Sequence, residues 1–195
     1  MPSYPTPAAI RSLPDSSPSL AKLSAIFRGA SVASALDAIW VPAVSAALVI
    51  FAGLVGQWMR QPWLFAGLGP TILLVASNPG HESSRFRSVI VGHLAAIGCA
   101  YLALLMLNAT GAPSLLVTST VPYARVWASA GALAMLALVM PQLRAYHPPA
   151  AATALLVTMG AYRMTGKTPL ALMGGVVLVA IMAEAVRRLN PKGSR

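Results

Sequence analysis

His147-Pro148-Pro149 opens an apolar segment, residues 150–160, that is short for a membrane span. Proline lacks a backbone N–H, so two prolines in a row mark the start of a helix rather than its interior. The first amides of a helix have no partner within it, and inside a bilayer they need one. A helix N-terminus also carries a partial positive charge. We therefore expect a position at membrane depth that suits an anion.

The composition indicates an integral membrane protein. Of the 195 residues, 57% are hydrophobic and 9% are charged, whereas soluble domains carry about 25% charged residues. The net charge of +10 comes from tails and loops around apolar blocks, which is typical of cytoplasmic loops rather than of a nucleic-acid surface. Cys99 is the only cysteine, which excludes an intrachain disulfide and the usual zinc patterns.

Six apolar segments predict an all-α polytopic membrane helix bundle. They are residues 39–59, 62–77, 89–107, 126–143, 148–160 and 169–186. A full crossing takes roughly 20 helical residues, so their order is long, short, long, and then the same again. We expect residues 37–187 to form the transmembrane domain and residues 188–195 a cytoplasmic tail. Residues 1–36 are expected to form a tail, of which 19–30 is an interfacial helix or an extension of the first span.

Two topologies compete for these segments. In one, all six cross the membrane; in the other, the short segments dip in and return, leaving four crossings. With an internal N-terminus, six crossings place ten of the 14 basic residues inside, whereas four crossings place eight inside. Since positive residues favour the cytoplasmic side, we prefer six crossings with both termini cytoplasmic. A bacterial plasma membrane is the expected location.

An internal repeat connects the two halves of the chain. Residues 62–70 align without a gap on residues 141–149, with both prolines of each stretch matched. Each half then runs on into a short apolar stretch that contains hydroxyl residues. With three crossings in each half, the second copy is inverted in the membrane. Inverted repeats with broken helices at their interface are common in secondary transporters.

The two matched breaks predict a binding site for a small monovalent anion. Each break, at Pro70 and at Pro149, would start a new helix, and two such ends would give a positive cavity without a lysine. The alternative is that the prolines only kink packed helices. The candidate substrate-binding residues are Gly69, Pro70, Thr71, Ser77, His93, His147, Pro148, Pro149, Ala150 and Thr153.

The histidines bring a titratable group to this site. Ionisable residues at membrane depth are costly and tend to be functional, and histidine titrates near physiological pH. His147 is expected to attract an anion when protonated, and to couple proton and anion movement. A purely structural role is the alternative for His147 and for His93. The chain has no nucleotide-binding loop and no catalytic triad or metalloprotease motif, so we expect neither an enzyme nor a cofactor.

Three motifs resemble those of the HPP family of integral membrane proteins. They are Ala145–Ala154, which contains His147-Pro148-Pro149, the stretch Gly69–Pro79, and Arg87–Leu94. They occur in the family order, and the resemblance covers residues 37–187. Members are small helical membrane proteins, often described with four spans, and some in cyanobacteria and chloroplasts are associated with nitrite transport.

The resemblance implies a transporter for nitrite or a similar anion. The rival interpretation is a membrane protein without transport activity, such as a sensor or an assembly partner. The expected partners are a small inorganic anion and the lipid bilayer, without nucleic acid. A chain this small is expected to pair as a homodimer that shields its site from lipid.

Overall fold

The computed structural model describes residues 35–163 and 165–189. The predicted N-terminal tail with its interfacial helix, apart from residues 35 and 36, lies outside this range, as do the last six residues of the C-terminal tail. Residues from Trp40 onward group into one unit, and the contacts below are within it.

Every apolar segment predicted from the sequence contains a helix. The described chain holds α3 (Ala35–Trp58), α4 (Leu68–Ser77), η1 (Glu82–Ser84), α5 (Phe86–Met106), α6 (Leu115–Thr118), α7 (Tyr123–Gln142), α8 (Ala150–Thr158) and α9 (Lys167–Leu189). The fold is therefore all-helical, as predicted. The short elements η1 and α6 were not predicted.

Four of these helices are long and apolar enough to span a membrane: α3, α5, α7 and α9. They expose many large apolar side chains, including Ile50, Leu105 and Leu138, and such continuous apolar exposure is expected where lipid rather than water surrounds the chain. At 1.5 Å per residue, α4 and α8 are only roughly 15 Å and 14 Å long, so neither crosses a bilayer as a helix alone.

The two short helices begin where proline allows them to. Helix α8 starts at Ala150, directly after Pro149, as predicted. Helix α4 starts at Leu68, so Pro70 lies inside its first turn and the break falls earlier than the sequence suggested. Proline is tolerated there because a first-turn N–H has no partner within the helix.

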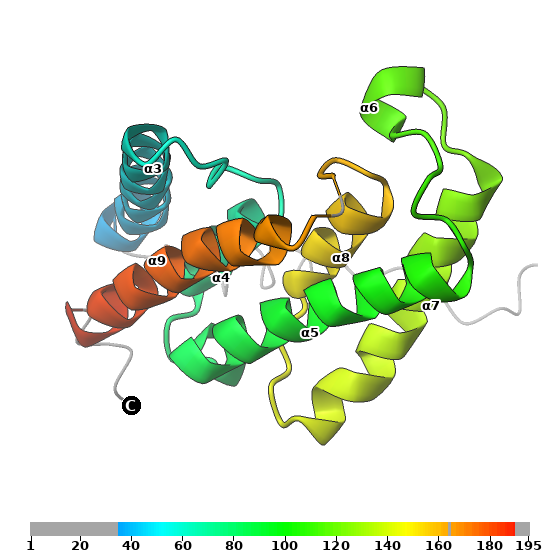
Figure 1. The fold of residues 1–195 in the computed structure, drawn as a ribbon. Coiled ribbons are helices and arrows are strands. Elements are labelled where there is room, and N and C mark those ends of the chain that lie inside the picture. Colours follow the sequence, from blue (N-terminus) through cyan, green and yellow to red (C-terminus); the bar gives the residue numbers. More distant parts are fainter. Residues whose placement is uncertain (1–34, 164, 190–195) are drawn as a thin grey trace, which may run out of the picture. The chain divides into compact units, whose positions relative to one another are not determined.

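Helix α5 is the central element of the unit. It packs against α7, α8, α9 and η1, and Figure 1 shows α7 and α8 beside it. Its buried face is made largely of small residues, among them Gly92, Ala96, Ala100 and Ala103. Small side chains let helix backbones approach closely, which is how helices pack in lipid.

Contacts at the two ends of α7 fix the course of the chain around α8. At the C-terminal end of α7, the Arg87 guanidinium donates to the carbonyls of Leu143 and Arg144, at 3.0 and 2.9 Å. At its N-terminal end, Arg125 donates to the Thr158 carbonyl at 2.7 Å. Residues 143–160, a non-helical lead followed by α8, therefore run from one end of α7 back to the other.

In the first half of the chain, residues 61–77 likewise place a non-helical stretch before a short helix, α4. The Trp63 side chain packs on Gly174 and Gly175, in the first half of α9. Helix α4 ends against η1, where the Ser84 hydroxyl donates to the Asn78 carbonyl at 2.8 Å. A non-helical lead thus precedes the short helix in this half as well.

The gapless alignment of the two halves does not carry over to the helices. It pairs Pro70 with Pro149 and hence Thr71 with Ala150, the first residue of α8, yet α4 begins three residues before Thr71, at Leu68. Pro141 lies inside α7, whereas Pro62 lies in a non-helical stretch. The order of long and short helices repeats, but the residue register does not.

Candidate functional site

Four predicted site residues meet in one buried cluster. The Thr71 hydroxyl lies 3.0 Å from His93 Nε2 and 3.1 Å from His147 Nε2. His93 Nδ1 lies 2.8 Å from the Thr153 hydroxyl, and His147 Nδ1 lies 2.7 Å from the Ser83 carbonyl oxygen. We call Thr71, His93, His147 and Thr153 the histidine–threonine cluster. All four are inaccessible to solvent in the monomer.

Each member of the cluster comes from a different part of the chain. Thr71 lies on the buried face of α4, together with Leu68, Ile72 and Val75, which recur at helical spacing. His93 lies on α5 and Thr153 in the first half of α8. His147 lies in the non-helical lead to α8. The cluster therefore joins both short helices to the central helix.

Two glycines make this convergence sterically possible. A Cβ on Gly92 would lie 2.7 Å from the Cβ of His147, so the glycine lets the α8 lead rest against α5. A Cβ on Gly67 would overlap the Thr153 hydroxyl. Gly67 is the N-cap of α4, so the first turn of α4 touches the first half of α8 at this point. The starts of the two short helices do converge.

Hydrogen bonding in the cluster involves no fixed charge. No lysine, arginine or carboxylate within residues 35–163 and 165–189 is hydrogen bonded to either cluster ring. The two rings lie with their centroids 5.1 Å apart. The same residues hold no group of three or more His, Cys, Asp or Glu that is placed for a metal ion. The cluster is thus a neutral network that gains charge only by protonation.

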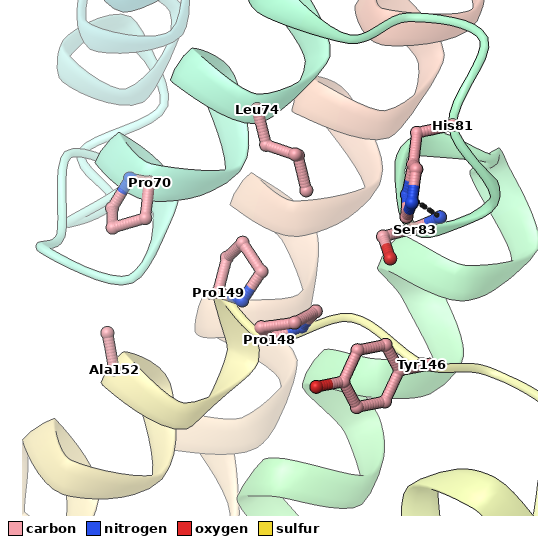
Figure 2. Close-up of a pocket in the computed structure, with 8 residues that line it drawn as sticks. All are labelled: Pro70, Leu74, His81, Ser83, Tyr146, Pro148, Pro149 and Ala152. Carbon is pink, nitrogen blue, oxygen red and sulfur yellow. Dashed lines mark hydrogen bonds between the residues drawn. The ribbon is translucent and has the colours of Figure 1, made fainter. Parts of the chain in front are cut away.

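Other predicted site residues lie around the cluster without joining it. Pro70, Pro148 and Pro149 line a groove of about 470 Å³, and Figure 2 shows the three prolines there together with Ser83 and Tyr146. Ala150 is buried at the start of α8, whereas Gly69 is exposed.

Ser77 lies apart from the histidine–threonine cluster. It lies exposed at the end of α4, where its hydroxyl donates to the Leu73 carbonyl at 2.7 Å. Six helical residues separate it from Thr71, a rotation of about 600° at 100° per residue, which puts the two on different faces. The helical period therefore keeps Ser77 out of the cluster that contains Thr71.

The amides after Pro149 are not free, in contrast to our expectation. The N–H groups of Ala150, Ala151 and Ala152 donate to the carbonyls of His147, Pro148 and Pro149, at 3.0 to 3.1 Å. A tight first turn thus satisfies the amides that the double proline was expected to leave unpaired. Any anion here must be held mainly by side chains.

Arg125 is a buried residue that the sequence did not single out. It is 5% exposed, and its guanidinium donates to the carbonyls of Ala112, Pro113 and Thr158. Gly160, at a φ of 78°, leaves room for it. Arginine therefore ties the end of α8 to the loop after α5. Nothing in the sequence marks Arg125 as buried, because it stands just before the apolar run of α7, where an ordinary cation that flanks a membrane span would also stand.

Basic residues line one cavity at each end of α7. Arg125 and Arg163 line a cavity of about 450 Å³ together with Tyr162, and burial raises the pKa of the Tyr162 phenol, which favours its protonated form. At the other end, a cavity of about 490 Å³ is lined by Arg85, Arg87 and Arg144. The basic residues thus form two separate groups.

Comparison with known protein families matches residues 30–195 to the family described as HPP, transmembrane region. The chain belongs to the HPP family. The match covers all of the helices described above, including both short ones, and confirms the resemblance drawn from the three motifs. No curated protein and no solved structure matches this HPP protein.

Proposed function

We propose that this HPP protein transports a small monovalent anion across the membrane, with nitrite as the first candidate. The observation that carries the proposal is the histidine–threonine cluster, a buried polar network where two half-length helices converge. Buried polar residues in a membrane domain are costly, and they tend to mark a substrate path.

The chemistry of the cluster favours an anion. A protonated histidine supplies positive charge, and the hydroxyls of Thr71 and Thr153 supply neutral donors. The N-termini of α4 and α8 add partial positive charge to the same region. Because no arginine or lysine of the described residues is bonded to the cluster, an anion would be attracted without a permanent countercharge that traps it. These properties suit a small ion that must leave as readily as it enters.

The arrangement of the segments supports six crossings in two inverted halves. Residues 143–160 connect opposite ends of α7, as a crossing formed by a non-helical lead and a half-helix would do. The four-crossing alternative puts Arg163 on the same side as Arg144. Instead, Arg163 shares a cavity with Arg125, and Arg144 lies near Arg87. This grouping of basic residues favours six crossings.

Cysteine labelling tests this topology. In a Cys99→Ala background, single cysteines are placed at the exposed positions Gly111, Arg144 and Arg163. We expect a membrane-impermeant maleimide to label Gly111→Cys and Arg163→Cys from one side, and Arg144→Cys only from the other. Labelling of Arg163→Cys together with Arg144→Cys would support four crossings instead.

Flux in proteoliposomes tests the function. The purified protein is reconstituted, and nitrite uptake is measured against empty vesicles and with sulfate as a divalent control. We expect uptake of nitrite well above the empty vesicles and little uptake of sulfate. Absence of flux for nitrite, nitrate, chloride and formate would favour the sensor or assembly role over transport.

A further inference from the structure

We propose that His147, Thr71 and His93 form a proton relay, in which the Thr71 hydroxyl passes a proton between the two histidines. The inference deepens the proposed function by adding a coupled proton. Its use in transport rests on that function, whereas the relay itself does not. The relay is inferred from which atom donates and which accepts in each hydrogen bond of the cluster, because the surrounding groups restrict these roles strongly.

The Ser83 carbonyl fixes the tautomer of His147. A carbonyl oxygen can only accept, so the 2.7 Å contact requires His147 Nδ1 to carry a hydrogen. In the neutral ring Nε2 is then a bare acceptor. Among the described residues, the only group bonded to it is the Thr71 hydroxyl, at 3.1 Å, and Nε2 is satisfied when this hydroxyl donates to it rather than to the Gly67 carbonyl.

The remaining bonds of the neutral cluster follow from this one. The Thr71 hydroxyl has a single hydrogen, which it gives to His147, so it must accept from His93 Nε2 at 3.0 Å. Neutral His93 then has a bare Nδ1, which accepts from the Thr153 hydroxyl at 2.8 Å. One direction of donation thus runs from Thr153 through His93, Thr71 and His147 to Ser83.

One added proton is accommodated without loss of a hydrogen bond. If His147 gains it, both ring nitrogens donate, to the Ser83 carbonyl and to the Thr71 oxygen. This state forms when the added proton reaches His93 Nδ1 from the Thr153 side, the His93 Nε2 proton moves to the Thr71 oxygen, and the Thr71 hydroxyl proton moves to His147 Nε2. The Thr71 hydroxyl then donates to the bare His93 Nε2, and the His93 Nδ1–H donates to Thr153. The carbonyl of Gly67, 3.2 Å from the Thr71 oxygen, offers the hydroxyl a further acceptor.

Transfer between the rings needs only two short proton movements. The Nε2 proton of His147 moves to the Thr71 oxygen while the Thr71 hydroxyl proton moves to His93 Nε2. Each step breaks one N–H or O–H bond and forms another, and no further reactant is involved. The result is a neutral His147 that keeps its Nδ1–H, and a His93 with protons on both nitrogens. The positive charge has then moved from the α8 lead to the central helix.

Other titratable side chains of the described residues lie near the cluster without a hydrogen bond to either ring. His81, the third histidine, is exposed, and its Nδ1 accepts from the Ser83 amide at 3.1 Å. Glu82 and Arg85 pair with each other on η1 and its flank, with mostly exposed side chains. Arg87 and Arg144 line the basic cavity at the end of α7. None of these side chains is bonded to either cluster ring within the described residues.

Nitrogen-15 NMR of histidine-labelled protein in lipid tests the relay directly. At neutral pH we expect one histidine with hydrogen on Nδ1, which disappears in His147→Asn, and two with hydrogen on Nε2. Thr71→Val has the same shape but no hydroxyl, so the protonation states of the two cluster rings should no longer depend on each other through this residue. In Thr71→Ser, which keeps the hydroxyl, they should. A wild-type His147 with hydrogen on Nε2 alone would overturn the relay.

The coupling is measured in proteoliposomes that contain a pH indicator. We expect wild-type protein and Thr71→Ser to move protons together with nitrite. In Thr71→Val the proton flux should be at least tenfold lower than in the wild type. Full proton flux in folded Thr71→Val would overturn the relay. Absence of nitrite flux in the wild type would instead reject the proposed function, and the NMR tautomers would still decide whether the relay exists.

Discussion

His147→Asn is expected to reduce nitrite uptake by at least tenfold while the protein stays folded. The asparagine amide can still donate to the Ser83 carbonyl, which His147 Nδ1 contacts at 2.7 Å, but it has no equivalent of Nε2. The variant therefore keeps the anchor of the α8 lead and removes the contact with Thr71 and the titratable group. Losing a hydrogen bond to a charged group costs about 1.5–3 kcal/mol, which corresponds to roughly 10- to 150-fold in rate.

Initial uptake rates in proteoliposomes with matched protein content give the measurement. Ser77→Ala is the matched control, because Ser77 is exposed and bonds only within and at the end of its own helix; its uptake should equal that of the wild type. His147→Ala adds a variant without the anchor. Undiminished uptake in His147→Asn would remove the ring from the transport mechanism.

Gly67→Ala is expected to destabilise the fold by separating α4 from α8. The backbone of Gly67 is in the ordinary helical region, at φ −67° and ψ −24°, so alanine brings no conformational strain. Its Cβ would overlap the Thr153 hydroxyl and lie 2.9 Å from the Phe65 ring. Overpacking of this kind costs about 1–3 kcal/mol, or roughly 2–12 °C in the unfolding midpoint of a chain this long.

Thermal unfolding in detergent measures the effect, and Gly69→Ala is its control. Gly69 lies two residues further along α4, and a Cβ there meets nothing within 4 Å. We expect its midpoint to stay within a degree or two of the wild type or to rise slightly. Adding Thr153→Ala to Gly67→Ala should recover part of the loss, because the two changes are coupled. Equal midpoints for Gly67→Ala and Gly69→Ala would show that the contact does not matter.

Local chemistry made the helices and the breaks predictable. Apolar segments with charged flanks predicted the six helices of nine residues or more, and the double proline before Ala150 predicted the start of α8 within one residue. Pro70 was a weaker guide, because proline is allowed anywhere in a first turn, and α4 begins two residues before it. Whether the short segments cross depends on tertiary contacts, such as those of Arg87 and Arg125, which no local pattern encodes.

The cluster could be predicted only in part for the same reason. His147, His93, Thr71 and Thr153 stand out because polar side chains are rare in apolar helices. Gly67 does not stand out, because two glycines lie within three residues of each other there and only the packing of α8 selects one of them. The Ser83 carbonyl has no sequence signal, since every residue carries one. Free amides after Pro149 were the wrong inference, because a tight turn satisfied them locally.

No charged side chain of the described residues is bonded to the cluster rings, and this has a consequence for the energetics of transport. A carrier that takes up one anion and one proton together moves no net charge, so the membrane voltage does no work on the loaded form. Only the concentration gradients of the two solutes would drive the cycle. A cell with an acidic exterior would then accumulate the anion even against an unfavourable voltage, and alkalinisation outside would reverse the flow.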